Sequence, residues 1–366
     1  MKKTIKTTVS ILLAVLIGAT LFACTAPKAT EAIPTDAPVT WTEAPIAAES
    51  TPEPQVAEPE ILPTDAPVEP TSEPQQTSPV RVAALAGQTG VGLAFLPEYS
   101  EQYQLELFSA PDQAVAKFLS GEADIAAVPI NLAATLYKKT EGNVAVIAVN
   151  TLGVLYFVEN GNTIHNISDL AGKTVYATGQ ASTPQYILEK ILADNGLSDI
   201  VTVEYIAEGS ALAAQLAEDN DTTIAFLPEP MVSVACAKSE TVHVALSANE
   251  LWKANNDAEI VQGVYIVRKD YLADNETAVE LFLRDAAASV ERVLTDENAA
   301  DAVVSLGIIG NAGVAKRAIP NCNIVLIRGE QMQKLVSSML ETLYNAAPSS
   351  VGGALPTEDF YYTHGS

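Results

Sequence analysis

Two stretches of this chain combine an apolar strand, a proline and a polar residue, and these residue types suit ligand binding. In the first, the apolar run 124–128 is followed by Pro129 and then by Asn131. In the second, the run 223–228 also ends in proline, and Glu229 comes next. Proline cannot donate to a sheet ladder, and a helix that starts there leaves backbone N–H groups free at the carboxyl end of the strand. Open α/β sheets bind ligands at that edge, so we expect ligand contacts at Pro129, Asn131 and Glu229.

Each polar residue also has a structural interpretation that the sequence leaves open. Asn131 can act as the N-cap of a helix over residues 132–137, without touching a ligand. Glu229 can be a carboxylate in the first turn of a helix, facing solvent.

A second pair of loops repeats the same arrangement. The strand that starts at Arg81 leads into Gly87-Gln88-Thr89-Gly90, and the strand that starts at Lys173 leads into a similar Gly-Gln loop. The two Gly-Gln loops are 92 positions apart and the two proline stops are 99 apart, in the same order. This spacing indicates an internal duplication, with Ser182 or Thr183 capping the helix of the second copy. The residues we expect to bind from these loops are Gln88, Thr89, Gly90, Gly179, Gln180, Ser182 and Thr183.

The chain lacks the patterns of most catalytic and cofactor sites. The loop at residues 87–92 has no Gly-Lys-Ser/Thr ending, and no acidic residue follows it at the distance that a dinucleotide site needs. The three histidines and three cysteines are not clustered. We therefore expect no enzyme activity, no cofactor and no metal site, and we interpret Cys236 and Cys322 as buried apolar side chains.

Bulk composition excludes two classes of partner. The formal charge of −25 argues against nucleic acid and against an anionic membrane surface. At 366 residues the chain is long enough for more than one compact unit.

Residues 1–24 have the pattern of a targeting segment. Lys2, Lys3 and Lys6 form a positive region, and residues 11–22 are a hydrophobic core too short for a comfortable membrane span. The segment ends in Leu-Phe-Ala-Cys24, which resembles the lipobox of bacterial lipoproteins, and this implies a lipidated Cys24 and anchoring to the outer face of the cell membrane. The alternative is an ordinary secretory signal.

Residues 25–79 predict a disordered stalk rich in Pro, Thr and Glu. They hold twelve of the 21 prolines and a single basic residue, Lys28. Such a composition cannot bury a core and stays extended.

The rest of the chain predicts an α/β protein with two lobes, each a mixed sheet flanked by helices. We expect lobe I to comprise residues 80–153 and 263–366, the second part being a helical C-terminal region, and lobe II to comprise residues 154–262. The chain would cross between the lobes twice, which is the arrangement of a hinge. The hinge-side loop Asn150-Thr151-Leu152 would complete the wall of the ligand cleft, with Thr151 and Leu152 as the expected ligand contacts.

Three phrases carry a family resemblance. Gly121-Glu-Ala-Asp-Ile-Ala, Ile167-Ser-Asp-Leu-Ala-Gly-Lys-Thr-Val and Leu227-Pro-Glu-Pro resemble substrate-binding proteins of ABC importers, in the group that serves nitrate, sulfonates such as taurine, and thiamine pyrimidine precursors. The resemblance implies a type 2 periplasmic-binding-protein fold, a small solute held between the lobes, ABC permease subunits as partners, and a monomer. Related folds also include enzymes and surface sensors, which are the alternatives.

The ligand class follows from the balance of charges in the predicted cleft. Helix starts near Thr89 and Ser182 favour an anionic group, but Glu229 adds a carboxylate, and no Arg or Lys stands in these loops. We therefore expect a neutral, zwitterionic or amine-bearing solute in preference to bare nitrate or sulfate.

Overall fold

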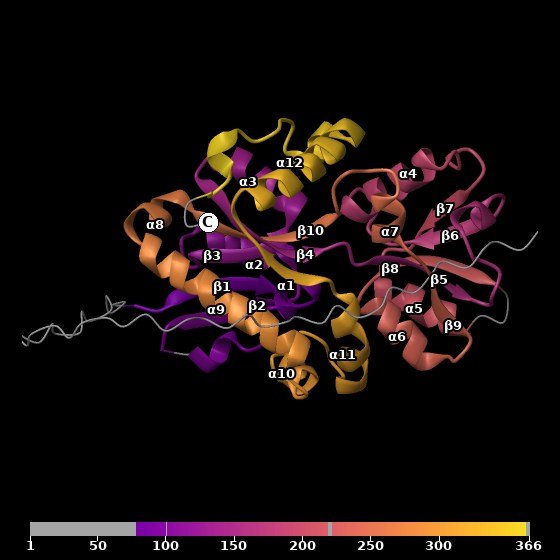
Figure 1. Ribbon diagram of the computed structural model, residues 1–366, viewed down its shortest axis with the longest axis horizontal. Helices are drawn as coiled ribbons and strands as arrows, with labels where there is room; N and C mark the ends of the chain where they lie inside the picture. The colour runs from indigo at the N-terminus through magenta and orange to yellow at the C-terminus, as the bar shows by residue number, and fades with distance from the viewer. Residues whose placement is uncertain (1–77, 100, 219–221, 364–366) are drawn as a thin grey trace, which may run out of the picture. The chain divides into compact units, whose positions relative to one another are not determined.

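The structure is a computed structural model that describes residues 78–99, 101–218 and 222–363, all within one compact unit of residues 70–366. The predicted targeting segment, with Cys24, and all but the last two residues of the predicted stalk lie outside the described residues. The described chain forms two separate mixed β-sheets with helices around them (Figure 1).

Lobe I contains a six-stranded sheet in the order β11-β4-β10-β3-β1-β2. Its strands are Val80–Leu85 (β1), Tyr103–Phe108 (β2), Ile125–Pro129 (β3), Val144–Leu152 (β4), Val261–Arg268 (β10) and Ile324–Ile327 (β11). β1 pairs in parallel with β2 and β3, and β10 runs antiparallel between β3 and β4. Since β10 follows only after the whole second sheet, the centre of this sheet joins distant parts of the chain (Figure 1).

Lobe II contains a five-stranded sheet in the order β7-β6-β8-β5-β9. Its strands are Leu155–Asn160 (β5), Thr174–Ala177 (β6), Thr202–Tyr205 (β7), Thr223–Pro228 (β8) and Val242–Ser247 (β9). β6 pairs in parallel with β7 and β8, whereas β5 runs antiparallel between β8 and β9.

The two sheets share one topology. Strands β7-β6-β8-β5-β9 repeat the order and directions of β2-β1-β3-β10-β4. The two Gly-Gln loops follow the equivalent strands β1 and β6, and the two prolines end the equivalent strands β3 and β8. The predicted two-lobed α/β fold is therefore confirmed.

Helices cover both faces of the lobe I sheet. α3 and α12 pack on one face, with Val264 and Ile266 of β10, while α9 packs on the other, with Tyr265 and Val267 (Figure 1). Among the described residues, no helix combines the length and the apolar character that crossing a membrane requires.

The helices of lobe I are Gln88–Val91 (α1), Pro111–Leu119 (α2), Ile130–Lys139 (α3), Lys269–Asp274 (α8), Glu276–Thr295 (α9), Ala299–Ser305 (α10), Ala312–Ala318 (α11) and Gly329–Ala346 (α12). Those of lobe II are Thr183–Asp194 (α4), Gly209–Glu218 (α5), Met231–Lys238 (α6) and Ala248–Lys253 (α7). Short 3-10 turns are Leu96–Tyr99 (η1), Ile167–Leu170 (η2), Ile319–Asn321 (η3), Pro348–Val351 (η4) and Glu358–Phe360 (η5).

Burial explains why the central strands and the long helices form. All nine residues of β4 are buried, as expected for a strand that is covered by helices on both faces. In α12 the buried residues recur at intervals of three and four, so one stripe faces the sheet. These residues are Met332, Leu335, Val336, Met339, Leu340 and Leu343.

β11 is a correction to the helical C-terminal region that the sequence predicts. Its four residues form an edge strand beside β4, with Ile324 opposite Thr151. Because four residues are too few to establish a periodicity, the neighbouring helical patterns concealed this strand.

The C-terminal aromatic residues form an ordered strap, which we define as residues 357–363. Tyr361 bridges to Val146 of β4, and the Tyr362 N–H donates to the Val146 carbonyl at 2.9 Å. Phe360 is fully buried, with its ring centroid 5.1 Å from that of Tyr137. The strap therefore fastens the end of the chain to the lobe I sheet.

Candidate functional site

The carboxyl end of β1 leads directly into the first predicted loop. Gln88, Thr89 and Gly90 lie in α1, and Gly87 before them has φ 131°, a conformation that favours glycine. A Cβ atom at Gly90 would lie 2.5 Å from the Leu85 carbonyl oxygen. Only glycine therefore fits at position 90, where α1 starts close to the end of β1.

Thr151 brings the end of β4 against this loop. Its hydroxyl donates to Asn150 Oδ1 at 2.9 Å and lies 3.4 Å from the Gln88 carbonyl oxygen. Thr89, Asn150 and Thr151 are all buried. Leu152, the last residue of β4, is buried as well and packs in the core on the α3 side of the sheet. Two predicted segments of lobe I, the Gly-Gln loop and the hinge-side loop, are therefore in contact.

Two buried polar groups near this contact have no hydrogen-bond partner among the described residues. They are the Asn150 Nδ2 donor and the Gln262 Oε1 acceptor. Nearly all buried polar groups in folded proteins are paired, so each exception requires an explanation. Asn150 lies near the end of β4, just before the first crossing between the lobes, and Gln262 lies near the start of β10, just after the second. Asn150 belongs to the hinge-side loop that the sequence predicts in the cleft wall, whereas the sequence did not single out Gln262.

Replacing Gly263 by alanine tests this packing. A Cβ atom there would lie 2.5 Å from Asn150 Oδ1 and 2.6 Å from Thr89 Cγ2. We expect Gly263→Ala to lower the free energy of unfolding by about 1–3 kcal/mol, because an added methyl group overpacks a buried contact. Urea unfolding measures this. Gly310→Ala is the control, since no atom lies within 4 Å of its Cβ position. Equal stabilities of the two variants would contradict the close approach.

The predicted N-cap role of Asn131 is wrong. α3 begins at Ile130, its N-cap is Pro129, and no side chain caps it. Asn131 is therefore the second residue of the helix and partly exposed. β3 runs through Pro129, and α3 follows at the next residue with no loop between them. The helix therefore begins before Asn131, where the sequence placed its N-cap.

The second Gly-Gln loop is shaped by left-handed backbone and by local hydrogen bonds. Gly179 has φ 76° and Ala181 has φ 58°. Ser182 is the N-cap of α4 by position, but its hydroxyl donates to the Gly179 carbonyl at 2.6 Å instead of capping the helix. Gln180 is exposed. The buried Thr183 hydroxyl has no partner within the described part of the chain, so it is the one predicted residue of this loop with an unsatisfied group.

Glu229 is fully buried, which excludes the solvent-facing interpretation. Its carboxylate accepts hydrogen bonds from the Ser233 N–H at 3.1 Å and the Ser233 hydroxyl at 3.0 Å. The Asn321 amide nitrogen, from the C-terminal part of the chain, lies 3.4 Å from Oε1. Burial raises the pKa of Glu229 from the ordinary 4.5 to about 7, against the lowering effect of these hydrogen bonds.

Residues 317–323 contribute contacts that sequence reasoning missed. The Tyr156 hydroxyl of lobe II donates to the Asn321 carbonyl at 2.9 Å, and Arg317 Nη1 donates to the Cys236 carbonyl at 3.3 Å. Asn323 Nδ2 donates to the Gly153 carbonyl at the first crossing. The sequence offers one signal for these contacts, the two asparagines on either side of Cys322. They lie just before β11, a strand that the sequence also failed to indicate.

The structure brings some predicted residues together and leaves others apart. Gln88 and Thr151 are in contact within lobe I, and Glu229 is linked to lobe I through Asn321. In the described ranges, no hydrogen bond or ion pair joins Gly179, Gln180, Ser182 or Thr183 to lobe I.

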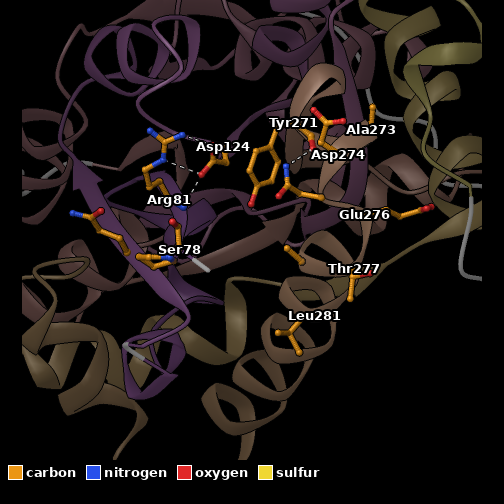
Figure 2. A pocket seen from close by; sticks show the side chains of 13 residues that line it. Ser78, Arg81, Asp124, Tyr271, Ala273, Asp274, Glu276, Thr277 and Leu281 are labelled. Atoms are coloured by element: carbon orange, nitrogen blue, oxygen red, sulfur yellow. Dashed lines mark hydrogen bonds and ion pairs between the residues drawn. The ribbon is translucent and has the colours of Figure 1, made fainter. Parts of the chain in front are cut away.

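A cavity of about 910 Å³ lies at the opposite, amino edge of the lobe I sheet (Figure 2). Its lining includes Arg81, Asp124 and Tyr271, together with Thr277 from the start of α9. Arg81 Nε donates to Asp124 Oδ2 at 3.0 Å, so the charges there already pair with each other (Figure 2). This cavity contains none of the predicted site residues.

The described residues contain no group of three or more His, Cys, Asp or Glu side chains arranged to hold a metal ion.

Comparison with known families shows a match over the central part of the chain. A model described as NMT1/THI5 like matches residues 104–300, which is more than half of the chain. No protein in the curated set matches.

Solved structures share the fold at low sequence identity. An ABC transporter structure from Parabacteroides distasonis is 20% identical with a TM-score of 0.68, over 78% of this chain and 99% of that one. The periplasmic aliphatic sulphonate-binding protein SsuA from Escherichia coli is 16% identical with a TM-score of 0.60, over 77% and 94%. The alkanesulfonate-binding protein SsuA from Xanthomonas axonopodis, bound to MOPS, is 14% identical with a TM-score of 0.54, over 77% and 96%. The fold is thus that of the periplasmic binding proteins.

Proposed function

The chain belongs to the NMT1/THI5-like family, and we propose that it is a substrate-binding protein of an ABC importer. It captures a small organic solute between its two lobes and delivers it to permease subunits in the membrane. The protein performs no chemistry on the solute. The fold that it shares with sulfonate-binding proteins supports this proposal.

The observation that carries the proposal is the direction of the equivalent strands. β4 ends at Leu152, where the chain crosses into lobe II, and β1 and β3 end at the same edge. In lobe II, Pro228 at the end of β8 pairs with Leu155, the first residue after that crossing. The carboxyl edges of both sheets therefore meet the crossing, which is where α/β sheets bind ligands.

We propose that the residues predicted at these edges bind the solute. In lobe I they are Gln88, Thr89, Gly90, Pro129, Asn131, Thr151 and Leu152, and in lobe II they are Gly179, Gln180, Ser182, Thr183 and Glu229. The buried Glu229 carboxylate and the lack of Lys and Arg in these loops favour a neutral, zwitterionic or amine-bearing solute. The unsatisfied Thr183 hydroxyl supports a polar contact from lobe II.

A thermal-shift screen of the intact protein tests the proposal. The panel contains taurine, ethanesulfonate, an aminopyrimidine, nitrate and sulfate. A solute at 100 times its dissociation constant stabilises the folded state by about 2.7 kcal/mol, which raises the midpoint of unfolding. We expect taurine or the aminopyrimidine to raise it and ethanesulfonate to have less effect. A response to nitrate or sulfate alone would contradict the proposed ligand class.

We further propose that lipidated Cys24 anchors the protein outside the cell membrane, which rests on the targeting segment at residues 1–24. We expect Cys24→Ser to move the protein from the membrane fraction to the soluble fraction, because serine has no thiol to carry the acyl chains that anchor the protein. Immunoblotting of fractionated cells measures this. Cys236→Ser is the matched control, and membrane retention of Cys24→Ser would contradict the anchor.

A further inference from the structure

Residues 317–323 hold lobe I against lobe II at several points near Glu229. Arg317, in α11, contacts the backbone of α6, and Asn321, at the end of η3, contacts both Glu229 and Tyr156. Figure 1 shows α11 beside α6, although α11 belongs to the C-terminal part of the chain. These contacts are made by protein groups alone, so they hold the lobes together without a solute.

We propose that Asn321 and Tyr156 form a latch between the lobes, and that a solute must displace Asn321 from the Glu229 carboxylate in order to bind. The latch itself is a property of the solute-free protein. Displacement of Asn321 by a solute rests on the proposed function.

The geometry supports a latch that can open. The contact from Asn321 Nδ2 to Glu229 Oε1 is 3.4 Å, which is long for a hydrogen bond, whereas the bond from the Tyr156 hydroxyl to the Asn321 carbonyl is 2.9 Å. Asn321 Nδ2 also donates to the Arg317 carbonyl at 3.1 Å, so the amide has a second partner on its own side when the latch opens. A donor on the solute can thus replace a weak contact.

The surroundings of Glu229 give the latch its selectivity for a donor. The groups that interact with this carboxylate are the Ser233 backbone and hydroxyl, Asn321, the Tyr156 hydroxyl, and the Cys236 and Cys322 thiols. None of these is a cation. Arg317 donates to the Cys236 carbonyl, in α6, and not to this carboxylate. A buried carboxylate with only neutral donors around it favours a solute with an N–H or ammonium group.

Cys322 is a built-in reporter of the latch. It follows Asn321 directly and is fully buried, and burial raises the pKa of its thiol. Cys322 packs in an apolar cluster of lobe I, and Glu229 of lobe II acts on its thiol, so we expect opening of the latch to remove the lobe II side of its cover and to expose the thiol to a reagent in solution. The rate at which Ellman's reagent labels Cys322, located by peptide mass spectrometry, therefore measures opening in the solute-free protein.

Three variants test the latch, at low urea concentrations that leave global unfolding negligible. Asn321→Ala and Tyr156→Phe each remove one bond between the lobes, and a net hydrogen bond of about 1 kcal/mol corresponds to roughly fivefold faster labelling. Asn345→Ala, on the exposed part of α12, is the control and should label at the wild-type rate. Tyr156→Phe keeps the ring, so it reports the latch even if Asn321→Ala fails to fold.

If both latch variants label Cys322 at the wild-type rate, the latch is overturned. It is also overturned if Cys322 is labelled only when the whole protein unfolds, in the wild type and in every variant.

The binding of a solute tests the second half of the proposal separately. For a panel solute that stabilises the protein, we expect Asn321→Ala to bind about fivefold more tightly, because no latch has to be displaced. Equal or weaker binding would overturn the competition. If no solute binds, the proposed function fails while the labelling result still decides the latch.

Discussion

Replacing Phe360 by alanine lowers the free energy of unfolding by about 3–5 kcal/mol. Phe360 has no exposed surface, and its ring packs edge-on against Tyr137 and Tyr361, with centroids 5.1 Å and 5.3 Å apart. Truncation to alanine removes these contacts and leaves a cavity beneath the strap, which the short 3-10 turn around the residue cannot fill. Urea unfolding followed by circular dichroism measures the loss.

A control just before the strap separates packing from a general effect of substitution. Leu355 is 39% exposed, so Leu355→Ala should change the free energy of unfolding by no more than about 0.5 kcal/mol. If Phe360→Ala is as stable as that control, then the strap does not fasten the C-terminus to the lobe I sheet.

Replacing Glu229 by glutamine stabilises the protein at pH 8 by up to about 3 kcal/mol and has no effect on stability at pH 4. Burial raises the pKa of Glu229 from 4.5 to about 7, so its ionised form opposes folding. The stability advantage of the neutral form is complete below pH 4.5 and is lost as the pH rises to about 7. Glutamine stays neutral, and it can still accept from the Ser233 N–H and donate to the Ser233 hydroxyl.

Unfolding of both proteins between pH 4 and pH 8 measures this prediction. Taking the difference in free energy of unfolding between variant and wild type at each pH cancels the contribution of the other carboxylates, which is the same in both proteins. Glu122→Gln, at an exposed site, is the control, and its difference should not grow from pH 5 to pH 7. A difference for Glu229→Gln that stays constant with pH would show that this carboxylate is not buried in solution.

The repeated strand pattern predicted the fold because each half gives the same signals in the same order. Proline stops mark the ends of β3 and β8, and Gly-Gln loops mark the ends of β1 and β6, so one duplication accounts for both sheets. Beyond the repeated part of the chain, no second copy indicates where a strand lies. β11 was missed because it has four residues and no counterpart in lobe II.

The environment of individual site residues could not be predicted in the same way. Nothing in the sequence around Glu229 indicates that Asn321, 92 positions later, contacts its carboxylate. That contact arises from packing between α11 and α6, which depends on tertiary structure. Likewise, Asn131 is a residue type that favours N-caps, but the N-cap of α3 is Pro129, two residues earlier.

Capture of a solute between the two lobes can be measured by a thermal-shift titration of the intact protein. The solutes are the panel named above and the small-molecule extract of the cells that produce the protein. We expect an amine-bearing or zwitterionic solute to raise the midpoint of unfolding with increasing concentration. The rise should be smaller in Thr151→Val and in Thr183→Val, one variant from each lobe. No rise with any panel member or with the extract would contradict solute capture.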